Sequence, residues 1–561
     1  MQIRKHALRF SLVFLTLIIC LGVFASKLIF IQVFNSSHLA NLAEKQHNHL
    51  IEIEPVRGAI FDRNLRPMAF NVAVYSLYAN PRRMSEENKA RVVREISVLL
   101  ELDPNFVRKR LSRDKFFVWI KRKLDFEVME EIESLKIRGL GFKKESKRFY
   151  PNQHLASHVI GFSGIDNHGL EGLELKYDDI LRGTPGRMQI IRDARHRELM
   201  IEEDIVVPKN GVHLVLSIDE TIQFIAERAL EKTFIKYKAN SATAIVMDVK
   251  TGEILALVNR PTYDLDNVRK SSIESRTNRA ISFVYEPGSV FKVIAAAAAL
   301  EEEAFNEDDI IFCENGEYRV ANHILHDHKP HGNLTFTEVF RYSSNIGTTK
   351  IAQKLGERTF YKYAKRFPIG RLTGIDLKGE VSGLLKKPST WSRTTIGALP
   401  IGHEVTTTPL QLVSMIATIA NDGVLMKPYV VKYIKDEHDE VIESFKPEII
   451  DRVISSNVAK RVTAILTDVV DEGTGRLAQI NGVRVAGKTG TAQKVINGRY
   501  SNSNFVATFV GFAPADNPRL AIAVVVDDPQ PIYYGGTVAG PVVKEILENS
   551  LKYLRVQGGQ E

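Results

Sequence analysis

Ser289 and Lys292 are the residues of this sequence that could most clearly do chemistry together. A serine and a lysine three residues apart fall on the same side of a helix, so the amine can reach the hydroxyl. Pro287 and Gly288 predict the turn that begins this helix, and the apolar, alanine-rich residues 293–300 predict a buried continuation. A helix N-terminus stabilises developing negative charge on the serine, and the same end and burial disfavour a protonated lysine. The pair therefore predicts a serine nucleophile with a lysine base.

Two further short motifs lie downstream of this pair. Ser343-Ser344-Asn345 comes first, and Lys488-Thr489-Gly490-Thr491 lies near the end of the chain. An isolated Ser-x-x-Lys occurs by chance in long chains, but the order Ser-x-x-Lys, Ser-x-Asn, Lys-Thr-Gly is far more specific. By these three motifs the sequence resembles the superfamily of penicillin-binding proteins and serine β-lactamases.

The resemblance implies a role for each residue of the first two motifs in acyl transfer to a D-alanyl peptide. Ser289 would be the nucleophile, and Lys292 the base that takes its proton. Ser343 would relay that proton toward the leaving amine. Asn345 would hold Lys292 and the substrate amide.

The third motif would bind the substrate. Lys488 would bring a positive charge that favours a neutral Lys292 and attracts a carboxylate, and the hydroxyls of Thr489 and Thr491 would bind that carboxylate. In the family, backbone N–H groups form the oxyanion hole, which by resemblance are those of Ser289 and Thr491. Gly490 would leave room for a substrate backbone beside the strand.

The elements that must position these residues can be predicted from the hydrophobic pattern. Residues 483–487 alternate as a strand does, and 505–513 and 520–527 predict two more strands. We therefore expect a three-stranded antiparallel meander that carries Lys-Thr-Gly on its first strand. Residues 242–248 and 253–258 predict a hairpin, joined by a Lys-Thr-Gly turn of its own.

The N-terminal segment is predicted to anchor the chain in a membrane. Residues 10–34 are almost entirely apolar and follow Arg4, Lys5 and Arg9. The positive-inside rule places residues 1–9 in the cytoplasm and the rest outside, which implies a single-pass protein of the bacterial cytoplasmic (inner) membrane. A cleaved signal peptide is the competing interpretation, because residues 23–25 resemble a cleavage site, but the length of the apolar stretch favours a retained anchor.

A region of different character, residues 35–210, precedes a predicted transpeptidase domain at 211–561. Residues 57–64 resemble the Arg-Gly-x-Ile-x-Asp-Arg-Asn-Gly element of the non-catalytic pedestal (dimerisation) module of class B penicillin-binding proteins, although Leu65 replaces its last glycine. The resemblance implies a multi-domain α+β protein: one transmembrane helix, an elongated pedestal, and a domain with an antiparallel sheet flanked by helices. It also implies structural ion pairs rather than catalysis for the pedestal motif residues, which are Arg57, Gly58, Asp62, Arg63 and Glu171.

Composition excludes some other functions. The formal net charge is +8, but the 67 acidic residues are interspersed among the basic ones, so nothing indicates a nucleic-acid partner. With only two cysteines, one of them in the apolar segment, no disulfide is expected. Histidines at 323, 326, 328 and 331 are spaced too loosely for a zinc site, so we expect an exposed loop there, no metal and no cofactor.

The choice within the superfamily depends on the anchor, the pedestal and the tail. Residues 528–541, with Asp-Pro, Tyr-Gly-Gly and a proline at the final helix, resemble the division-specific (septal) class B D,D-transpeptidases. The side-wall (elongation) enzyme, a membrane-bound penicillin sensor and an inactive scaffold of the same fold remain alternatives. The family implies peptidoglycan stem peptides ending in D-Ala-D-Ala as substrate, β-lactams as inhibitors, and a polytopic membrane glycan polymerase and other divisome proteins as partners.

Overall fold

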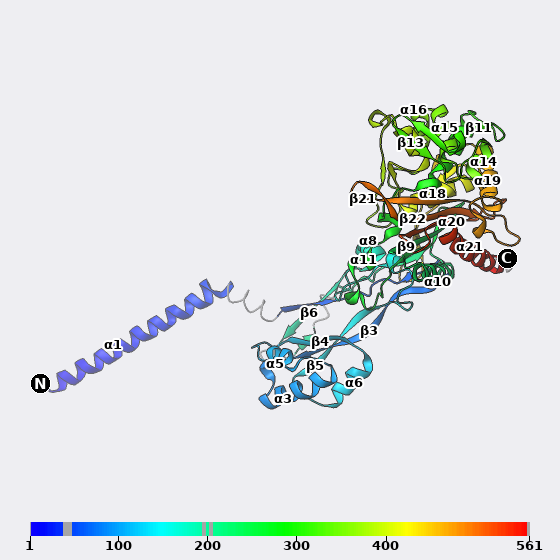
Figure 1. Cartoon of the computed structure of the whole chain (residues 1–561). Coiled ribbons are helices and arrows are strands. Elements are labelled where there is room, and N and C mark those ends of the chain that lie inside the picture. The colour runs from blue at the N-terminus through cyan, green and yellow to red at the C-terminus, as the bar shows by residue number, and fades with distance from the viewer. Residues whose placement is uncertain (1, 38–47, 193–197, 201–205, 558–561) are drawn as a thin grey trace. The chain divides into compact units, whose positions relative to one another are not determined.

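We describe the fold from a computed structural model (Figure 1). The residues that it describes are 2–37, 48–192, 198–200 and 206–557. The contacts within the chain divide it into two compact units, one made of 1–56 with 183–210 and the other of 57–182 with 211–561.

The first unit contains the apolar N-terminal segment and a small sheet. Helix α1 (Gln2–Ile29) continues as a π-helical turn (Phe30–Phe34), and its large apolar side chains from Leu8 onward are exposed. Within the described residues it is the one helix long and apolar enough to cross a membrane, which fits the predicted anchor. Strand β6 (Gly186–Arg192) pairs with both β1 (Asn48–Ile53) and β7 (Glu198–Met200).

The second unit begins with a lobe of long strands and short helices. Strand β3 (Pro67–Ala79) pairs with β4 (Val118–Leu124) and β5 (Leu140–Phe149). A separate core of apolar residues lies between this sheet and the helices that cover it. These helices are α3 (Glu86–Arg91), the π-helical turn Val92–Ile96, α5 (Pro104–Leu111) and α6 (Phe126–Ser134).

The same sheet continues across the position at which we expected a domain boundary. Strand β2 (Ile60–Phe61) pairs antiparallel with β3 and parallel with β8 (His213–Leu216), which in turn pairs with β18 (Val431–Lys435). The predicted division between residues 210 and 211 therefore separates strands that share one hydrogen-bonded sheet, although it stays a prediction as a boundary of function.

The predicted antiparallel sheet lies in the C-terminal part of the second unit. Its order is β10-β9-β23-β22-β21, and every neighbouring pair is antiparallel. The meander and the hairpin are confirmed, with strands β9 (Ser241–Asp248), β10 (Ile254–Arg260), β21 (Ala486–Ile496), β22 (Arg499–Ala513) and β23 (Leu520–Asp527). The strand predicted at 483–487 begins only at Ala486, the first residue of β21 that pairs with β22, opposite Phe512.

Helices cover both faces of this sheet. Alternate residues of β23 belong to different cores, since side chains along a strand point to opposite faces: Ala521, Ala523 and Val525 on one side, Ile522, Val524 and Val526 on the other. The first core includes α13 (Lys292–Glu301) and α18 (Pro409–Ala420). The second includes α10 (Glu220–Lys236) and α21 (Gly540–Gln557), which pack together (Figure 1).

Candidate active site

Ser289 lies in a single 3₁₀ turn, Gly288–Phe291, that leads directly into α13. The regular helix thus begins at Lys292 rather than before Ser289, but a 3₁₀ turn places residues i and i+3 on the same side. Among the described residues the Ser289 hydroxyl makes no hydrogen bond. The hydrogen bond that we expected between this hydroxyl and the Lys292 amine is therefore not formed, and the amine binds Ser343 and Asn345. Catalytic hydrogen bonds commonly tighten only when substrate is bound.

Ser343 stands at the junction of two helices, α14 (Phe336–Arg341) and α15 (Asn345–Leu355). Its backbone is left-handed, with φ at 60°, a conformation that costs about 1–3 kcal/mol for a residue other than glycine and is concentrated at functional sites. In this conformation both its carbonyl oxygen and its hydroxyl point at the Lys292 amine, from 2.6 Å and 3.2 Å.

The two lysines meet at the Ser343 hydroxyl. Lys292 Nζ also donates to Asn345 Oδ1 at 2.7 Å, and Lys488 Nζ donates to Ser343 Oγ at 2.9 Å. The structure thus brings together Lys292, Ser343, Asn345 and Lys488 from three separate segments. The Ser343 hydroxyl lies between two amines, as a proton relay requires.

Burial lowers the pKa of both lysines. Each side chain is 0% exposed, and desolvation disfavours the charged form. Burial, reinforced by the nearby charge of Lys488, lowers the pKa of Lys292 well below its usual value, while Asp327 acts in the opposite direction. Burial also lowers the pKa of Lys488 to about 7. A neutral Lys292 can accept a proton, and Lys488 changes charge near neutral pH unless a bound carboxylate stabilises its ammonium form.

Asp327 is a functional residue that the sequence analysis passed over. It lies in the histidine-rich segment that we expected to be only an exposed loop. Its carboxylate accepts hydrogen bonds from the Ser344 hydroxyl at 2.6 Å and from the backbone N–H groups of Asn345 and Ile346. Because these groups begin α15, Asp327 fixes the Ser-x-Asn motif at a helix N-terminus, where a carboxylate is stabilised. The sequence shows an acidic residue at this position, but no neighbouring residue indicates that its carboxylate binds the Ser-x-Asn motif.

Strand β21 forms the opposite wall of the site. Thr491 Oγ1 accepts from Gly535 N at 3.0 Å, which leaves its own hydroxyl proton to donate, and Thr489 shares a hydrogen bond of 2.7 Å with Thr474. A Cβ on Gly490 would lie 2.9 Å from Pro287 O, so only glycine lets this strand approach the Ser289 turn so closely.

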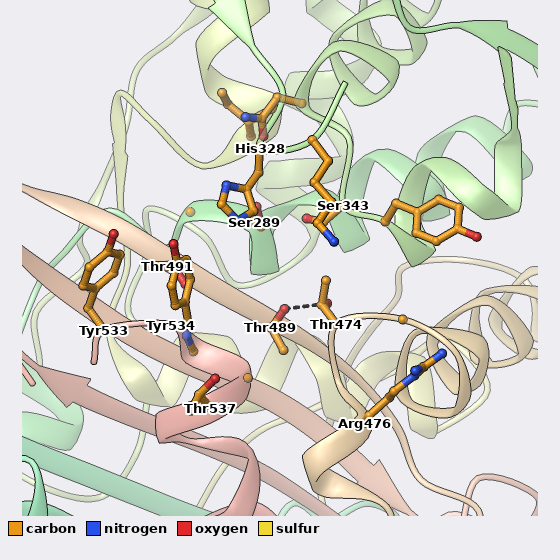
Figure 2. A pocket seen from close by; sticks show the side chains of 18 of the residues that line it. Ser289, His328, Ser343, Thr474, Arg476, Thr489, Thr491, Tyr533, Tyr534 and Thr537 are labelled. Carbon is orange, nitrogen blue, oxygen red and sulfur yellow. Dashed lines mark hydrogen bonds between the residues drawn. The ribbon is translucent and has the colours of Figure 1, made fainter. Parts of the chain in front are cut away.

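The three motifs open into one cavity of about 750 Å³. Figure 2 shows Ser289 and Ser343 on one side of it, with Thr489 and Thr491 of β21 opposite. The cavity is also lined by residues that the sequence analysis did not assign to the site, which are His328, His331, Tyr342, His403, Glu472, Arg476, Tyr533 and Tyr534.

The clustered histidines have different surroundings. His328 packs beside Tyr534, and His331 stacks on Tyr342, while His326 lies 3.6 Å from a Glu317 oxygen. In the described part of the chain, no three histidine, cysteine or acidic side chains gather as a metal site would require.

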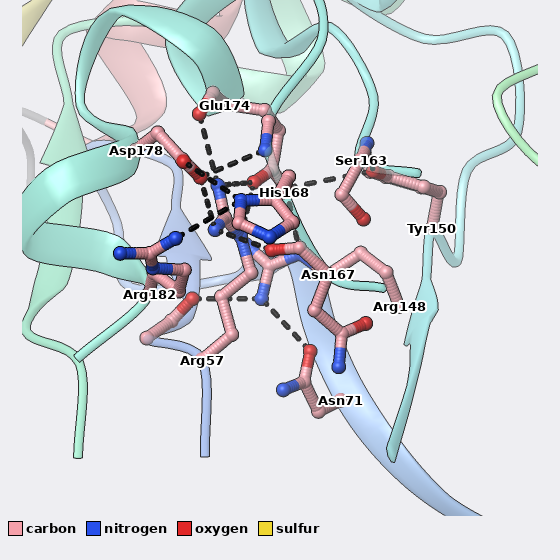
Figure 3. A network of polar contacts seen from close by, with 12 residues as sticks. Arg57, Asn71, Arg148, Tyr150, Ser163, Asn167, His168, Glu174, Asp178 and Arg182 are labelled. Carbon is pink, nitrogen blue, oxygen red and sulfur yellow. Dashed lines mark hydrogen bonds and ion pairs between the residues drawn. The ribbon is translucent and has the colours of Figure 1, made fainter. Parts of the chain in front are cut away.

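The pedestal motif builds a buried ion network (Figure 3). Arg57, which is 2% exposed, donates to Glu174 Oε2 and Asp178 Oδ1, both at 2.6 Å. Arg148 donates to the other Glu174 oxygen at 2.6 Å and to Gly58 O at 2.7 Å. Glu174 therefore holds two buried guanidinium groups, and it was not singled out in the sequence because its partners are far away in the chain.

The remaining pedestal residues lie around this network. Arg63 pairs with Glu253 at 3.2 Å, and Glu171 with Arg276 at 3.1 Å, as expected of structural ion pairs. A Cβ on Gly58 would lie 1.8 Å from Val212 O, so two chain segments cross there in contact.

The expectation that Asp62 joins an ion pair is wrong within the described residues. Its buried carboxylate instead accepts backbone N–H bonds from Asn64, Arg66 and Glu220. Asp62 therefore stabilises a turn through hydrogen bonds to the main chain, a role that its local sequence could not distinguish from an ion pair.

Comparisons with known families match most of the chain. The family described as "Penicillin binding protein transpeptidase domain" matches residues 242–548, and the one described as "Penicillin-binding Protein dimerisation domain" matches residues 52–216. The first match includes every residue of the three motifs. It also includes the whole five-stranded sheet apart from Ser241, the first residue of β9.

Individual relatives extend over nearly the full length. Stage V sporulation protein D of Bacillus subtilis is 35% identical over 99% of this chain and 88% of its own. The peptidoglycan D,D-transpeptidase FtsI of Escherichia coli is 31% identical over 98% and 92%. The crystal structure of penicillin binding protein 3 of Mycobacterium tuberculosis with aztreonam superposes with a TM-score of 0.70, at 29% identity over 90% and 98%. With these matches and this site, the chain belongs to the class B penicillin-binding proteins.

Proposed function

We propose that this protein is a serine D,D-transpeptidase that cross-links peptidoglycan stem peptides through an acyl-enzyme on Ser289, in septal wall synthesis during cell division. The observation that carries the chemistry is the Ser343 hydroxyl, which lies 3.2 Å from the Lys292 amine and 2.9 Å from that of Lys488, at the cavity that contains Ser289.

In the first step, Ser289 Oγ attacks the carbonyl between the two D-alanines of a donor peptide. Lys292, whose burial lowers its pKa and so favours the neutral amine, takes the serine proton. The Ser343 hydroxyl passes a proton on to the leaving amine, while Asn345 keeps the Lys292 amine in place. The terminal D-alanine departs, and the donor remains as an ester on Ser289.

Strand β21 binds the substrate in this scheme. The hydroxyls of Thr489 and Thr491 line the cavity and hold the terminal carboxylate, which the charge of the buried Lys488 attracts, and Gly490 lets the strand lie against the Ser289 turn. The backbone N–H groups of Ser289 and Thr491 stabilise the oxyanion, where each such donor contributes about 2.7–4 kcal/mol. In the second step an amine of a neighbouring stem peptide takes the acyl group. β-Lactams imitate the donor and leave a slowly hydrolysed ester.

Labelling with a penicillin tests the nucleophile. The full chain in detergent is incubated with a labelled penicillin and digested, and the modified peptide is mapped. We expect a stable adduct on Ser289 that Ser289→Ala abolishes and Ser282→Ala, a substitution on the nearby helix α12 (Arg279–Ser282), leaves intact. An adduct on another residue would contradict the proposal, and rapid release of the product would instead identify a β-lactamase.

The septal assignment is supported by the tail. Residues 528–541 resemble the septal class, and within them Tyr533 and Tyr534 line the cavity while Pro541 lies in the first turn of α21. Depletion of the protein from cells separates the two class B roles: filaments indicate division, whereas rounded cells would identify a side-wall enzyme.

The membrane topology and partners complete the proposal. Helix α1 crosses the bacterial inner membrane with residues 1–9 in the cytoplasm, and the catalytic domain lies outside. A polytopic glycan polymerase and other divisome proteins contact the anchor and the pedestal. Photo-crosslinkers placed along α1 should capture the polymerase, and capture of lipid alone would contradict this contact.

A further inference from the structure

We propose that His403, held by Glu286, is the general base that removes a proton from the acceptor amine in the second step of the reaction. This inference rests on the proposed transpeptidase function and adds a residue to it that lies outside the three motifs. It concerns a carboxylate–imidazole pair at the same cavity as Ser289.

The pair is firmly oriented. His403 Nδ1 lies 2.8 Å from Glu286 Oε2. The other oxygen of Glu286 accepts from Glu404 N at 3.0 Å and from the Tyr500 hydroxyl at 3.3 Å, so three donors fix the carboxylate. Tyr500 also packs edge-on against the imidazole, with ring centres 5.0 Å apart.

This arrangement determines which imidazole nitrogen is available. A carboxylate only accepts, so Nδ1 of His403 carries the hydrogen, and in the neutral imidazole Nε2 carries the lone pair. Among the described residues Nε2 has no hydrogen-bond partner. An orienting carboxylate behind a histidine whose second nitrogen is available is the arrangement that general-base histidines require.

The pair stands next to the nucleophile's turn. Gly288 N donates to Gly402 O at 3.3 Å, and a Cβ on Gly402 would lie 2.1 Å from Gly288 O, so the two backbones are in direct contact. Ser289 and His403 are the next residues along these two segments, and both line the cavity. Glu286 itself lies on the turn that carries Ser289, and it ties the two segments together.

The second step requires a base beyond Lys292. The acceptor arrives as an ammonium group, R–NH₃⁺, and must lose two protons to become an amide N–H. His403 Nε2 takes the first and becomes an imidazolium, leaving R–NH₂. The amine nitrogen then forms the bond to the acyl carbon as the bond to Ser289 Oγ breaks. The second proton passes from the amine through Ser343 and then Lys292 to Ser289 Oγ, and the imidazolium returns its proton to water.

The charged and titratable groups that face His403 are compatible with this role. Glu286 and Tyr500 of β22 contact the pair directly, and Glu404 follows His403 in the chain. The other titratable or charged residues that line the same cavity are His328, Lys329, His331, Tyr342, Glu472, Arg476, Tyr533 and Tyr534. Burial, together with the nearby Glu286, raises the pKa of Tyr500, so its hydroxyl stays neutral and donates to Glu286. The purely structural alternative is that the pair only holds the two segments together.

The test separates the two steps of the reaction. His403→Asn keeps a donor near the position of Nδ1 for Glu286 but removes Nε2. Acylation of Ser289 is followed with labelled penicillin, and transfer with a thioester analogue of the donor peptide and a D-amino acid as acceptor. The quantity that decides the test is the ratio of acyl transfer to the D-amino acid over hydrolysis by water. His323→Asn, at an exposed position outside the cavity, is the matched control.

We expect the transfer-to-hydrolysis ratio of His403→Asn to fall by about 10²-fold, with acylation close to that of the native protein. Glu286→Gln provides the same test if His403→Asn does not fold, and we expect a lower ratio there because an amide no longer fixes the imidazole in the orientation that a base requires. An unchanged ratio, or a parallel fall in acylation and transfer, would overturn the inference. Failure of penicillin to label Ser289 in the native protein would instead overturn the proposed function itself.

Discussion

This protein has two groups of buried basic side chains, and the two groups contact different kinds of oxygen atom. In the pedestal network, Arg57 and Arg148 contact carboxylates, above all both oxygens of Glu174. In the candidate active site, Lys292 and Lys488 are equally buried, but the oxygens that they contact belong to hydroxyl, amide and carbonyl groups.

The difference separates fixed charge from mobile charge. An arginine stays protonated, and a carboxylate in contact repays much of its desolvation, so such a network holds segments together. A buried lysine without a contacting carboxylate has its pKa lowered, as burial does here for Lys292 and Lys488, and it can exchange a proton during a reaction. The pedestal therefore uses buried charge for stability, whereas in the proposed mechanism the cavity uses it for chemistry.

The largest expected effect is that of Lys292→Met, which removes the mobile proton but keeps the side-chain volume. We expect acylation by labelled penicillin to fall by about 10²–10⁴-fold, as for the loss of a general base. The unfolding temperature should stay equal or rise, because a buried amine is replaced by an apolar group. Acylation within about tenfold of the native rate would show that another group is the base.

Glu174→Gln breaks the network instead. It leaves two buried arginines short of countercharge, so the free energy of unfolding should fall by about 3–5 kcal/mol. Thermal or urea unfolding of the detergent-solubilised chain measures this change. Glu171→Gln is the control: its carboxylate is 34% exposed and pairs with Arg276, so the loss should stay under about 1 kcal/mol. Equal losses in the two variants would contradict the comparison.

The pH profile sharpens the role of Lys488. Burial lowers its pKa to about 7, so in the free protein its positive charge is present below that pH and lost above it. The second-order rate constant for acylation should therefore decline as pH rises past about 7, since the carboxylate of penicillin loses its partner. In Lys488→Arg the charge persists, and the alkaline limb should move to higher pH. If the alkaline limb of the acylation profile stays at the same pH in Lys488→Arg, a group other than Lys488 causes it.

The smallest expected effect is at Asp62, which belongs to the same sequence motif as Arg57 but accepts hydrogen bonds from main-chain N–H groups. Asp62→Asn replaces one accepting oxygen with a donor that faces Glu220 N, so we expect a loss of about 1–3 kcal/mol in unfolding free energy. Acylation of the folded protein should not change. A loss as large as that of Glu174→Gln would mean that Asp62 is part of the charge network after all.

The sequence by itself determined those features whose causes are local. The turn at Pro287 and Gly288, the alanine-rich helix after it, the strands of the meander and the apolar N-terminal helix all follow from side chains adjacent in the chain, and the structure has each of them. The order of the three motifs also identified the family, because motif spacing needs no coordinates.

Only the tertiary structure decided which distant groups meet. That Asp327 holds the Ser-x-Asn motif, that Glu174 bridges two arginines, and that Asp62 serves the main chain depend on contacts between residues far apart in sequence. The left-handed backbone of Ser343 and the sheet that β2 and β8 share, on either side of residues 210 and 211, also depend on such distant contacts. The physical reason is that charge state and hydrogen bonding depend on burial and on the partner across the fold, and no local pattern of residues specifies either one.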